Sequence, residues 1–200
     1  RRHCQAIGSL YWKGWIRNLK RANMANHKIL APFIRFYEGG FVNDKDDPGG
    51  ATNRGVTLAT FRGVFGKRKT ASDLKNMTAT QWDTIFKKHF WDKCKSDTIN
   101  DQSVANMLVD FAWHSGIGNA VPIMQKVVGL HRQDGIVGDI TLTAINTYPN
   151  QKALFENLKK ARMDFLRGRK TWWKYGKGWT NRVNGIEYGS ITYGGIEHKC

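Results

Sequence analysis

Apolar residues recur at three- and four-residue spacing along most of the chain, which is the pattern of helices that bury one face. In KILAPFIRFY (28–37) this spacing is soon followed by a Gly-Gly pair, a helix stop, and Pro32 should mark the first turn or kink the helix. A Thr-x-x-Gln capping box opens the next clear pattern, at 78–91. The same spacing predicts further helices over 100–116, 119–129, 139–147 and 151–168.

One stretch breaks the helical pattern. Between Phe41 and Thr57, glycines divide a segment rich in Val and Thr, which favours a short β-hairpin or a three-stranded ribbon. No internal repeat and no Pro- or Ser-rich linker divides the chain. We therefore predict a mainly α protein with one small sheet, in which Glu38 lies on the last turn of a helix just before that sheet.

The chain is strongly basic. Its 200 residues include 32 Lys and Arg against 16 Asp and Glu, which gives a formal charge of +16 and a pI of about 10.0. Such a charge favours a polyanionic partner, and nucleic acid, an anionic membrane surface and the bacterial cell wall all qualify. No helix-turn-helix, zinc-finger or RNA-recognition signature accompanies the charge, so any nucleic-acid binding should be nonspecific.

Several features exclude other classes of protein. No window approaches about eighteen uninterrupted apolar residues, so we predict no transmembrane helix. Cys4, Cys94 and Cys200 are too few and too far apart for a disulfide framework, and no recognised ligand spacing is present, so we predict no metal.

Residues 1–23 carry six Lys and Arg and no acid, and a lysine interrupts their apolar stretch. This is unlike a signal peptide, and we interpret the segment as a basic N-terminal extension.

The carboxylates are concentrated in EGGFVNDKDDPGG, where Glu38 is followed by Asp44, Asp46 and Asp47. Hydrolysis of a glycosidic bond needs a protonated carboxyl beside the leaving oxygen and a carboxylate that activates water or attacks directly. A glutamate at a helix end among apolar side chains can keep its proton, because desolvation disfavours the charged form. The stretch therefore holds candidates for both roles.

Phe36, Tyr37 and Phe41 are the local candidates for such an apolar environment. Two structural interpretations of the aspartates stay open beside the catalytic one. They can occupy an exposed turn, since Asp-Pro-Gly-Gly is favourable turn sequence. A calcium loop is the other alternative, but the stretch lacks the glycine and the final glutamate of an EF-hand at their required spacing.

The stretch EGGFVNDKDDPGGATNRGVT (38–57) resembles the signature of glycoside hydrolase family 108. This family comprises the N-acetylmuramidases of phage endolysins and related bacterial proteins, some described as secretion activators. Residues 109–129 are similar to the family's central helix pair, and residues 134–146 and 162–186 to the peptidoglycan-binding region that follows it. The resemblance implies a lysozyme-like α+β fold, with the small sheet beside the catalytic glutamate. It also implies a lysozyme-like catalytic region (24–125) and a helical peptidoglycan-binding region packed on it (126–200), which follow the basic extension (1–23).

The same resemblance implies roles for individual residues. Glu38 matches the glutamate of the family's E-G-G motif, which is the catalytic acid. Phage-type lysozymes show a glutamate, eight intervening residues, an aspartate, five more residues and a threonine. Here eight residues separate Glu38 from Asp47, and four separate Asp47 from Thr52. We therefore predict Asp47 as the second carboxylate and Thr52 as the residue that positions water, with Asp44 as the alternative because the second gap is one residue short.

Three residues of the segment 109–116 are further candidates. Trp113 is the tryptophan most suited to face a sugar ring, although core packing is the more common role of tryptophan. His114 stands where many relatives have asparagine and either lines the sugar cleft or caps a helix; the structural role is favoured, because most histidines do no chemistry. Asp110 is expected to tie helix ends together.

The leading prediction is a monomeric peptidoglycan hydrolase that cleaves the β-1,4 bond between N-acetylmuramic acid and N-acetylglucosamine without a cofactor. A cell-wall binding or secretion-assisting protein without turnover is the alternative, and a nonspecific nucleic-acid binder is less favoured. We expect synthesis in the cytoplasm and action in the periplasm or cell wall after export or release. The resemblance to phage endolysins implies a prophage-type protein whose release a holin assists.

Overall fold

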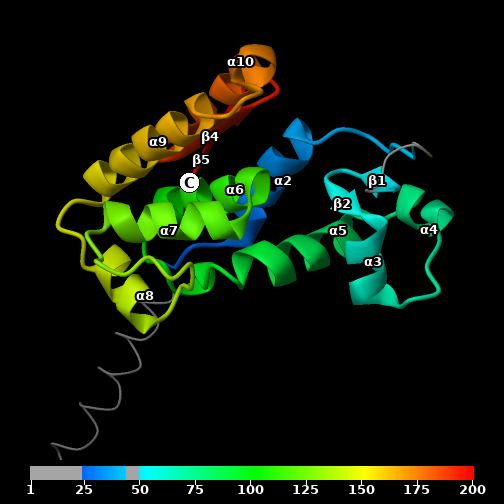
Figure 1. The fold of residues 1–200 in the computed structure, drawn as a ribbon, viewed down its shortest axis with the longest axis horizontal. Helices are drawn as coiled ribbons and strands as arrows, with labels where there is room; N and C mark the ends of the chain where they lie inside the picture. The colour runs from blue at the N-terminus through cyan, green and yellow to red at the C-terminus, as the bar shows by residue number, and fades with distance from the viewer. Residues whose placement is uncertain (1–23, 44–49) are drawn as a thin grey trace, which may run out of the picture.

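The computed structural model describes residues 24–43 and 50–200, and within them α-helices dominate (Figure 1). Short helical turns follow α5 at Lys87–Trp91 (π) and precede α6 at Ser96–Thr98 (3₁₀). The α-helices are α2 (His27–Tyr37), α3 (Leu58–Phe65), α4 (Ala71–Lys75), α5 (Ala79–Phe86), α6 (Gln102–Ser115), α7 (Ile117–Val127), α8 (Asp139–Asn146), α9 (Gln151–Arg167) and α10 (Trp172–Asn184).

The helix α6 is the centre of the fold. All of its residues from Ser103 to Ala112 are buried, so it is covered on every side, as expected for a core helix. The side chain of Asp101 caps its first turn and Gly116 ends it. Helices α2, α7 and α9 and the strand β3 (Ile186–Glu187) pack around α6, while α3, α4 and α5 gather at the other end of the molecule (Figure 1).

The predicted sheet is a two-stranded antiparallel hairpin of β1 (Thr52–Asn53) and β2 (Val56–Thr57). Val42 extends it through a bridge to Thr52, with backbone hydrogen bonds of 2.8 Å in both directions. The two loop residues, Arg54 and Gly55, have φ values of 48° and 75°. Positive φ at both loop positions is the geometry of the tight hairpin turn that matches strand twist. The prediction of a small hairpin or ribbon is confirmed.

A second sheet was not predicted. The strands β3, β4 (Ser190–Tyr193) and β5 (Ile196–Lys199) form an antiparallel meander at the end of the chain. The strands have two to four residues each, so the alternation of buried and exposed positions is too short to be recognised in sequence. The fold class itself, a mainly α lysozyme-like fold with a small antiparallel sheet, is confirmed.

The five helices after the first are confirmed with shifted ends, and the Thr78–Gln81 capping box of α5 is present. Pro32 lies in the interior of α2, so of its two predicted roles the place in the first turn is wrong and the kink stays a prediction. Helices α3, α4 and α10 were not predicted.

The boundary proposed at residue 125 stays a prediction; that position lies inside α7, and one hydrophobic cluster includes residues from both sides of it. Among the described residues, no helix is long and apolar enough to cross a bilayer.

Candidate active site

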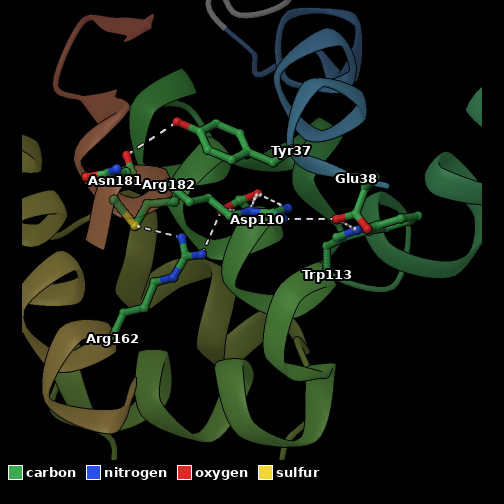
Figure 2. Close-up of polar contacts among 8 residues, drawn as sticks. Tyr37, Glu38, Asp110, Trp113, Arg162, Asn181 and Arg182 are labelled. Atoms are coloured by element: carbon green, nitrogen blue, oxygen red, sulfur yellow. Dashed lines mark hydrogen bonds and ion pairs between the residues drawn. The ribbon is translucent and has the colours of Figure 1, made fainter. Parts of the chain in front are cut away.

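Glu38 stands where α2 ends. Its backbone N–H donates to the Ile34 carbonyl, but its own backbone is extended, so the chain leaves the helix at this residue. The side chain points toward α6 and α10, as Figure 2 shows. The chain then continues through two glycines to the bridge residue Val42, which places Glu38 between the central helix and the hairpin.

Two donors hold one oxygen of the Glu38 carboxyl. Oε1 accepts hydrogen bonds from the Trp113 indole Nε1 at 2.7 Å and from the Arg182 Nη1 at 2.9 Å. The Glu38 side chain keeps 17% of its surface exposed, so it is not closed off from solvent. Residues of α6 and α10 therefore fix the orientation of the carboxyl on a side chain that stays partly exposed.

The other oxygen, Oε2, lies against the hairpin turn. A Cβ atom built on Gly55 would come within 2.6 Å of Oε2 and 2.8 Å of Trp113 Cζ2, closer than real atoms approach. Gly55 also has φ of +75°, a conformation that favours glycine. The backbone of the hairpin turn thus lies directly against the carboxyl, and only glycine at this position leaves room for that contact.

Behind Glu38 lies a buried ion cluster. The Asp110 carboxylate accepts from Arg182 Nη2 at 2.7 Å and Nε at 3.0 Å, and from Arg162 Nη2 at 2.7 Å. The side chains of Asp110 and Arg162 are fully buried, and that of Arg182 is 7% exposed. Because Arg182 also reaches Glu38, one guanidinium connects a buried carboxylate on α6 to a partly open one at the end of α2 (Figure 2).

The cluster keeps Asp110 ionised. Burial alone raises the pKa of a carboxyl, but the Arg182 and Arg162 guanidiniums outweigh it and lower the pKa of Asp110 to about 2. Burial lowers the pKa of the Arg182 guanidinium, but the Asp110 and Glu38 carboxylates outweigh that effect and raise it. Two guanidiniums thus contact the Asp110 carboxylate, and one of them, that of Arg182, also donates to Glu38.

Aromatic rings pack around the Trp113 indole that holds Glu38. The Trp113 ring contacts Phe90 at a centroid distance of 4.6 Å, Trp82 at 5.2 Å and Phe86 at 5.8 Å. Trp82 in turn donates from its indole to the Arg54 carbonyl of the hairpin turn at 2.9 Å. This aromatic packing fixes the indole that holds Glu38 and ties it to the hairpin.

The apolar environment expected for Glu38 from its sequence neighbours is not the one observed. Phe36 is 54% exposed. The Tyr37 hydroxyl points to the Asn181 carbonyl at 3.4 Å, with its ring beside the Arg182 guanidinium. The side chains that contact the carboxyl come instead from distant parts of the chain, because Glu38 leaves the helix and turns away from its sequence neighbours.

The structure brings some predicted residues together. Trp113 contacts Glu38 directly, and Thr52 belongs to the hairpin whose turn contacts Glu38. Asp44 and Asp47 lie outside the described residues.

Sequence reasoning missed the two arginines. Asp110 is a carboxylate in an otherwise apolar helix, and a buried carboxylate needs a cationic partner. Its partners lie 52 and 72 residues away, where they are two among many basic residues. Asp110 was expected to tie helix ends together, and in the structure it links α6 to α9 and α10 through Arg162 and Arg182.

His114, the residue after Trp113, faces a different neighbourhood. Its ring meets the Trp179 ring edge to face at 5.5 Å. Burial, together with the nearby Arg162 and Arg182 charges, lowers the pKa of His114 to about 4. The imidazole is therefore neutral at physiological pH.

No metal centre is evident in residues 24–43 and 50–200, where no three His, Cys, Asp or Glu side chains gather closely enough to hold an ion. The described elements make up a mainly α, lysozyme-like fold. A comparison with curated proteins found no match. The family model described as glycosyl hydrolase 108 matches residues 31–116.

A solved structure titled "Structure of Brucella abortus SagA" is similar over most of the chain. The two share 38% sequence identity over 78% of this chain and 87% of that one, with a TM-score of 0.66. The chain therefore belongs to the glycosyl hydrolase 108 family.

Replacing the buried carboxylate should destabilise the fold strongly. Asp110→Asn leaves Arg162 buried without a charged partner, and breaking a buried ion pair in this way costs about 3–5 kcal/mol. We expect the urea unfolding midpoint to fall accordingly. The matched control is Asp164→Asn, which removes an exposed carboxylate on α9 that pairs with Lys160 and Arg167 and should lower the stability far less, because exposed ion pairs contribute little. Equal effects of the two substitutions would contradict the role given to the cluster.

The His114 environment makes the fold sensitive to mild acid. An unfolded histidine takes up its proton near pH 6.5, whereas folded His114 does so only near pH 4. Between these values the unfolded chain binds more protons, so the free energy of unfolding should fall as the pH drops from 6.5 to 4. Chemical denaturation across this range should show a flatter profile for His114→Gln. The exposed His131→Gln serves as the control and should keep the wild-type slope; an unchanged slope in His114→Gln would refute the assignment.

Proposed function

We propose that this protein is a peptidoglycan hydrolase of the muramidase type, which cleaves the β-1,4 bond between N-acetylmuramic acid and N-acetylglucosamine. The observation that carries the proposal is the Glu38 carboxyl, held by Trp113 and Arg182 and still partly open to solvent. Membership of a glycoside hydrolase family supports it.

In this proposal Glu38 is the general acid. The hydrogen bonds from Trp113 and Arg182 engage Oε1, which leaves Oε2 as the oxygen that carries the transferable proton. A carboxyl whose orientation is fixed before the substrate binds can transfer its proton to the glycosidic oxygen without first having to reorient. The Arg182 charge is shared with Asp110, so it does not act on Glu38 alone.

The second carboxylate is proposed to be Asp47, with Asp44 as the alternative. Both belong to the segment between Asn43 and Gly50. The bridge between Val42 and Thr52 brings the two flanks of that segment together at the hairpin that contacts Glu38. One of these aspartates would steady the developing positive charge of the sugar or activate a water, which Thr52 would help to position.

The substrate sets the place of action. Peptidoglycan lies outside the cytoplasmic membrane, so the protein would act in the periplasm or cell wall after export or release. The charge of +16 favours a wall that carries anionic polymers and peptide carboxylates. We further propose that the protein acts as a monomer without a cofactor, and that residues 126–200 contribute to wall binding.

The variant Glu38→Gln tests the proposal. Glutamine keeps the size of the side chain and an oxygen that can accept from Trp113, but it has no transferable proton. A general acid contributes roughly 10²–10⁴-fold, so turnover should fall by at least that lower factor while thermal stability and wall binding persist. The assay is the loss of turbidity of purified peptidoglycan, with mass spectrometry of the released fragments to identify reducing-end muramic acid.

The exposed Glu156→Gln is the matched control and should retain wild-type turnover. Wild-type activity in Glu38→Gln would remove this glutamate from the mechanism. A wild-type protein that binds the wall but releases no muramic acid ends would instead favour the non-catalytic, secretion-assisting alternative.

A further inference from the structure

A hollow is lined by residues of α6, α7, α9 and α10. It has a volume of about 270 Å³ and is formed where α6 and α9 end and α10 begins. His114 lines it, and His114 directly follows Trp113, the residue that holds Glu38. Trp179, which also lines the hollow, lies three residues before Arg182 on α10, so the two helices that reach Glu38 also line the hollow. The other residues used below are Ser115, Asn119, Phe165, Arg169, Thr171 and Trp179.

Arg169 gives the hollow its charge. Its guanidinium stacks over the Phe165 ring at 4.2 Å, and no carboxylate of the described residues forms an ion pair with it. The surrounding segment 159–182 contains nine Lys and Arg but a single acid, Asp164, which pairs with Lys160 and Arg167. The hollow therefore presents an exposed cation in a strongly basic surrounding, which favours an anionic ligand.

Neutral polar groups complete the lining. Ser115 and Thr171 bring hydroxyls and Asn119 brings an amide, all of which can bond a carboxylate or a peptide group. His114 adds an imidazole that is uncharged at physiological pH, so the positive charge of the lining comes from Arg169. Trp179 and Phe165 supply apolar walls against which short aliphatic segments can pack.

We propose that this hollow binds a carboxylate of the acidic stem peptide that muramic acid carries, and that it selects peptide-bearing glycan over bare glycan. The inference rests on the proposed function, because it concerns the same substrate. A carboxylate fits better than a neutral sugar, since the guanidinium offers paired donors that match carboxylate geometry. The helices that reach Glu38 through Trp113 and Arg182 also line the hollow, which suits a group attached to the sugar at the cleavage point.

The concave shape favours this ligand over a membrane surface. Insertion into a bilayer needs an extended apolar face, whereas the exposed side chains of α10 alternate between aromatic and basic, with Trp173 at 83% exposure beside Lys174.

The test measures binding to the inactive variant Glu38→Gln, so that ligands stay intact. Isothermal titration would compare the N-acetylglucosamine–N-acetylmuramic acid disaccharide with the same disaccharide carrying its stem peptide. We expect the peptide-bearing ligand to bind roughly tenfold more tightly, the size of one charge-assisted hydrogen bond at a partly exposed site. Adding Arg169→Gln should abolish this difference and leave the affinity for the bare disaccharide unchanged.

The control is Lys170→Gln, which removes an equal charge from the neighbouring exposed position and should keep the difference. Equal affinities for the two ligands in the protein with intact Arg169 would overturn the proposal. If the Arg169 and Lys170 variants lost the difference in affinity equally, the proposal would also be overturned, because the effect would then reflect the general positive charge of the surface. A stronger Arg169-dependent affinity for single-stranded DNA than for the peptide-bearing ligand would overturn it as well.

Activity separates this proposal from the function on which it rests. Wild-type protein should digest intact peptidoglycan about tenfold more efficiently than glycan strands stripped of their peptides by an amidase. Equal digestion of both substrates would overturn the selectivity and leave the muramidase function standing. Peptide-dependent binding through Arg169 with no digestion of either substrate would support the site and refute the hydrolase.

Discussion

The structure depends on a carboxylate buried inside its central helix. Asp110 has no access to water, and an isolated charge in such a place would cost far more than the whole stability of a domain. Arg162 and Arg182 make that burial possible, one from α9 and one from α10. Removing either guanidinium would leave an uncompensated buried charge. Ion pairs as well as apolar packing therefore hold these two helices against α6.

This constraint reaches the proposed active site through Arg182. The guanidinium that neutralises Asp110 also holds Glu38, so a residue near the end of the chain sets the position of the proposed catalytic carboxyl. The family model covers residues 31–116, which include Glu38 and Asp110 but neither arginine. The part of the chain beyond that match is therefore needed to complete the site and to balance the charge of the central helix.

Much of the fold could be predicted from the sequence, because its long helices carry repeated apolar positions, stop glycines and capping residues. The hairpin was also predicted, since Gly55 and the residues rich in Val and Thr mark it. The features that the sequence did not predict are contacts between residues far apart in the chain and strands that are very short. The sheet β3–β4–β5 has strands of two to four residues, and Arg182 lies 144 residues from Glu38. Local pattern carries no information about which of many basic side chains will meet a given carboxylate.

The substitution Arg182→Lys tests the central claim most directly, with kcat and KM measured separately on purified peptidoglycan fragments. Lysine keeps the positive charge, but its single ammonium cannot pair with Asp110 and hold Glu38 in the same fixed fork. The account predicts a folded protein whose kcat falls at least roughly tenfold while KM stays near the wild-type value, as expected when a charge-assisted hydrogen bond that orients the acid is lost. The exposed Arg167→Lys should change neither quantity. A folded Arg182→Lys protein with wild-type kcat would contradict the claim that this arginine positions the catalytic carboxyl.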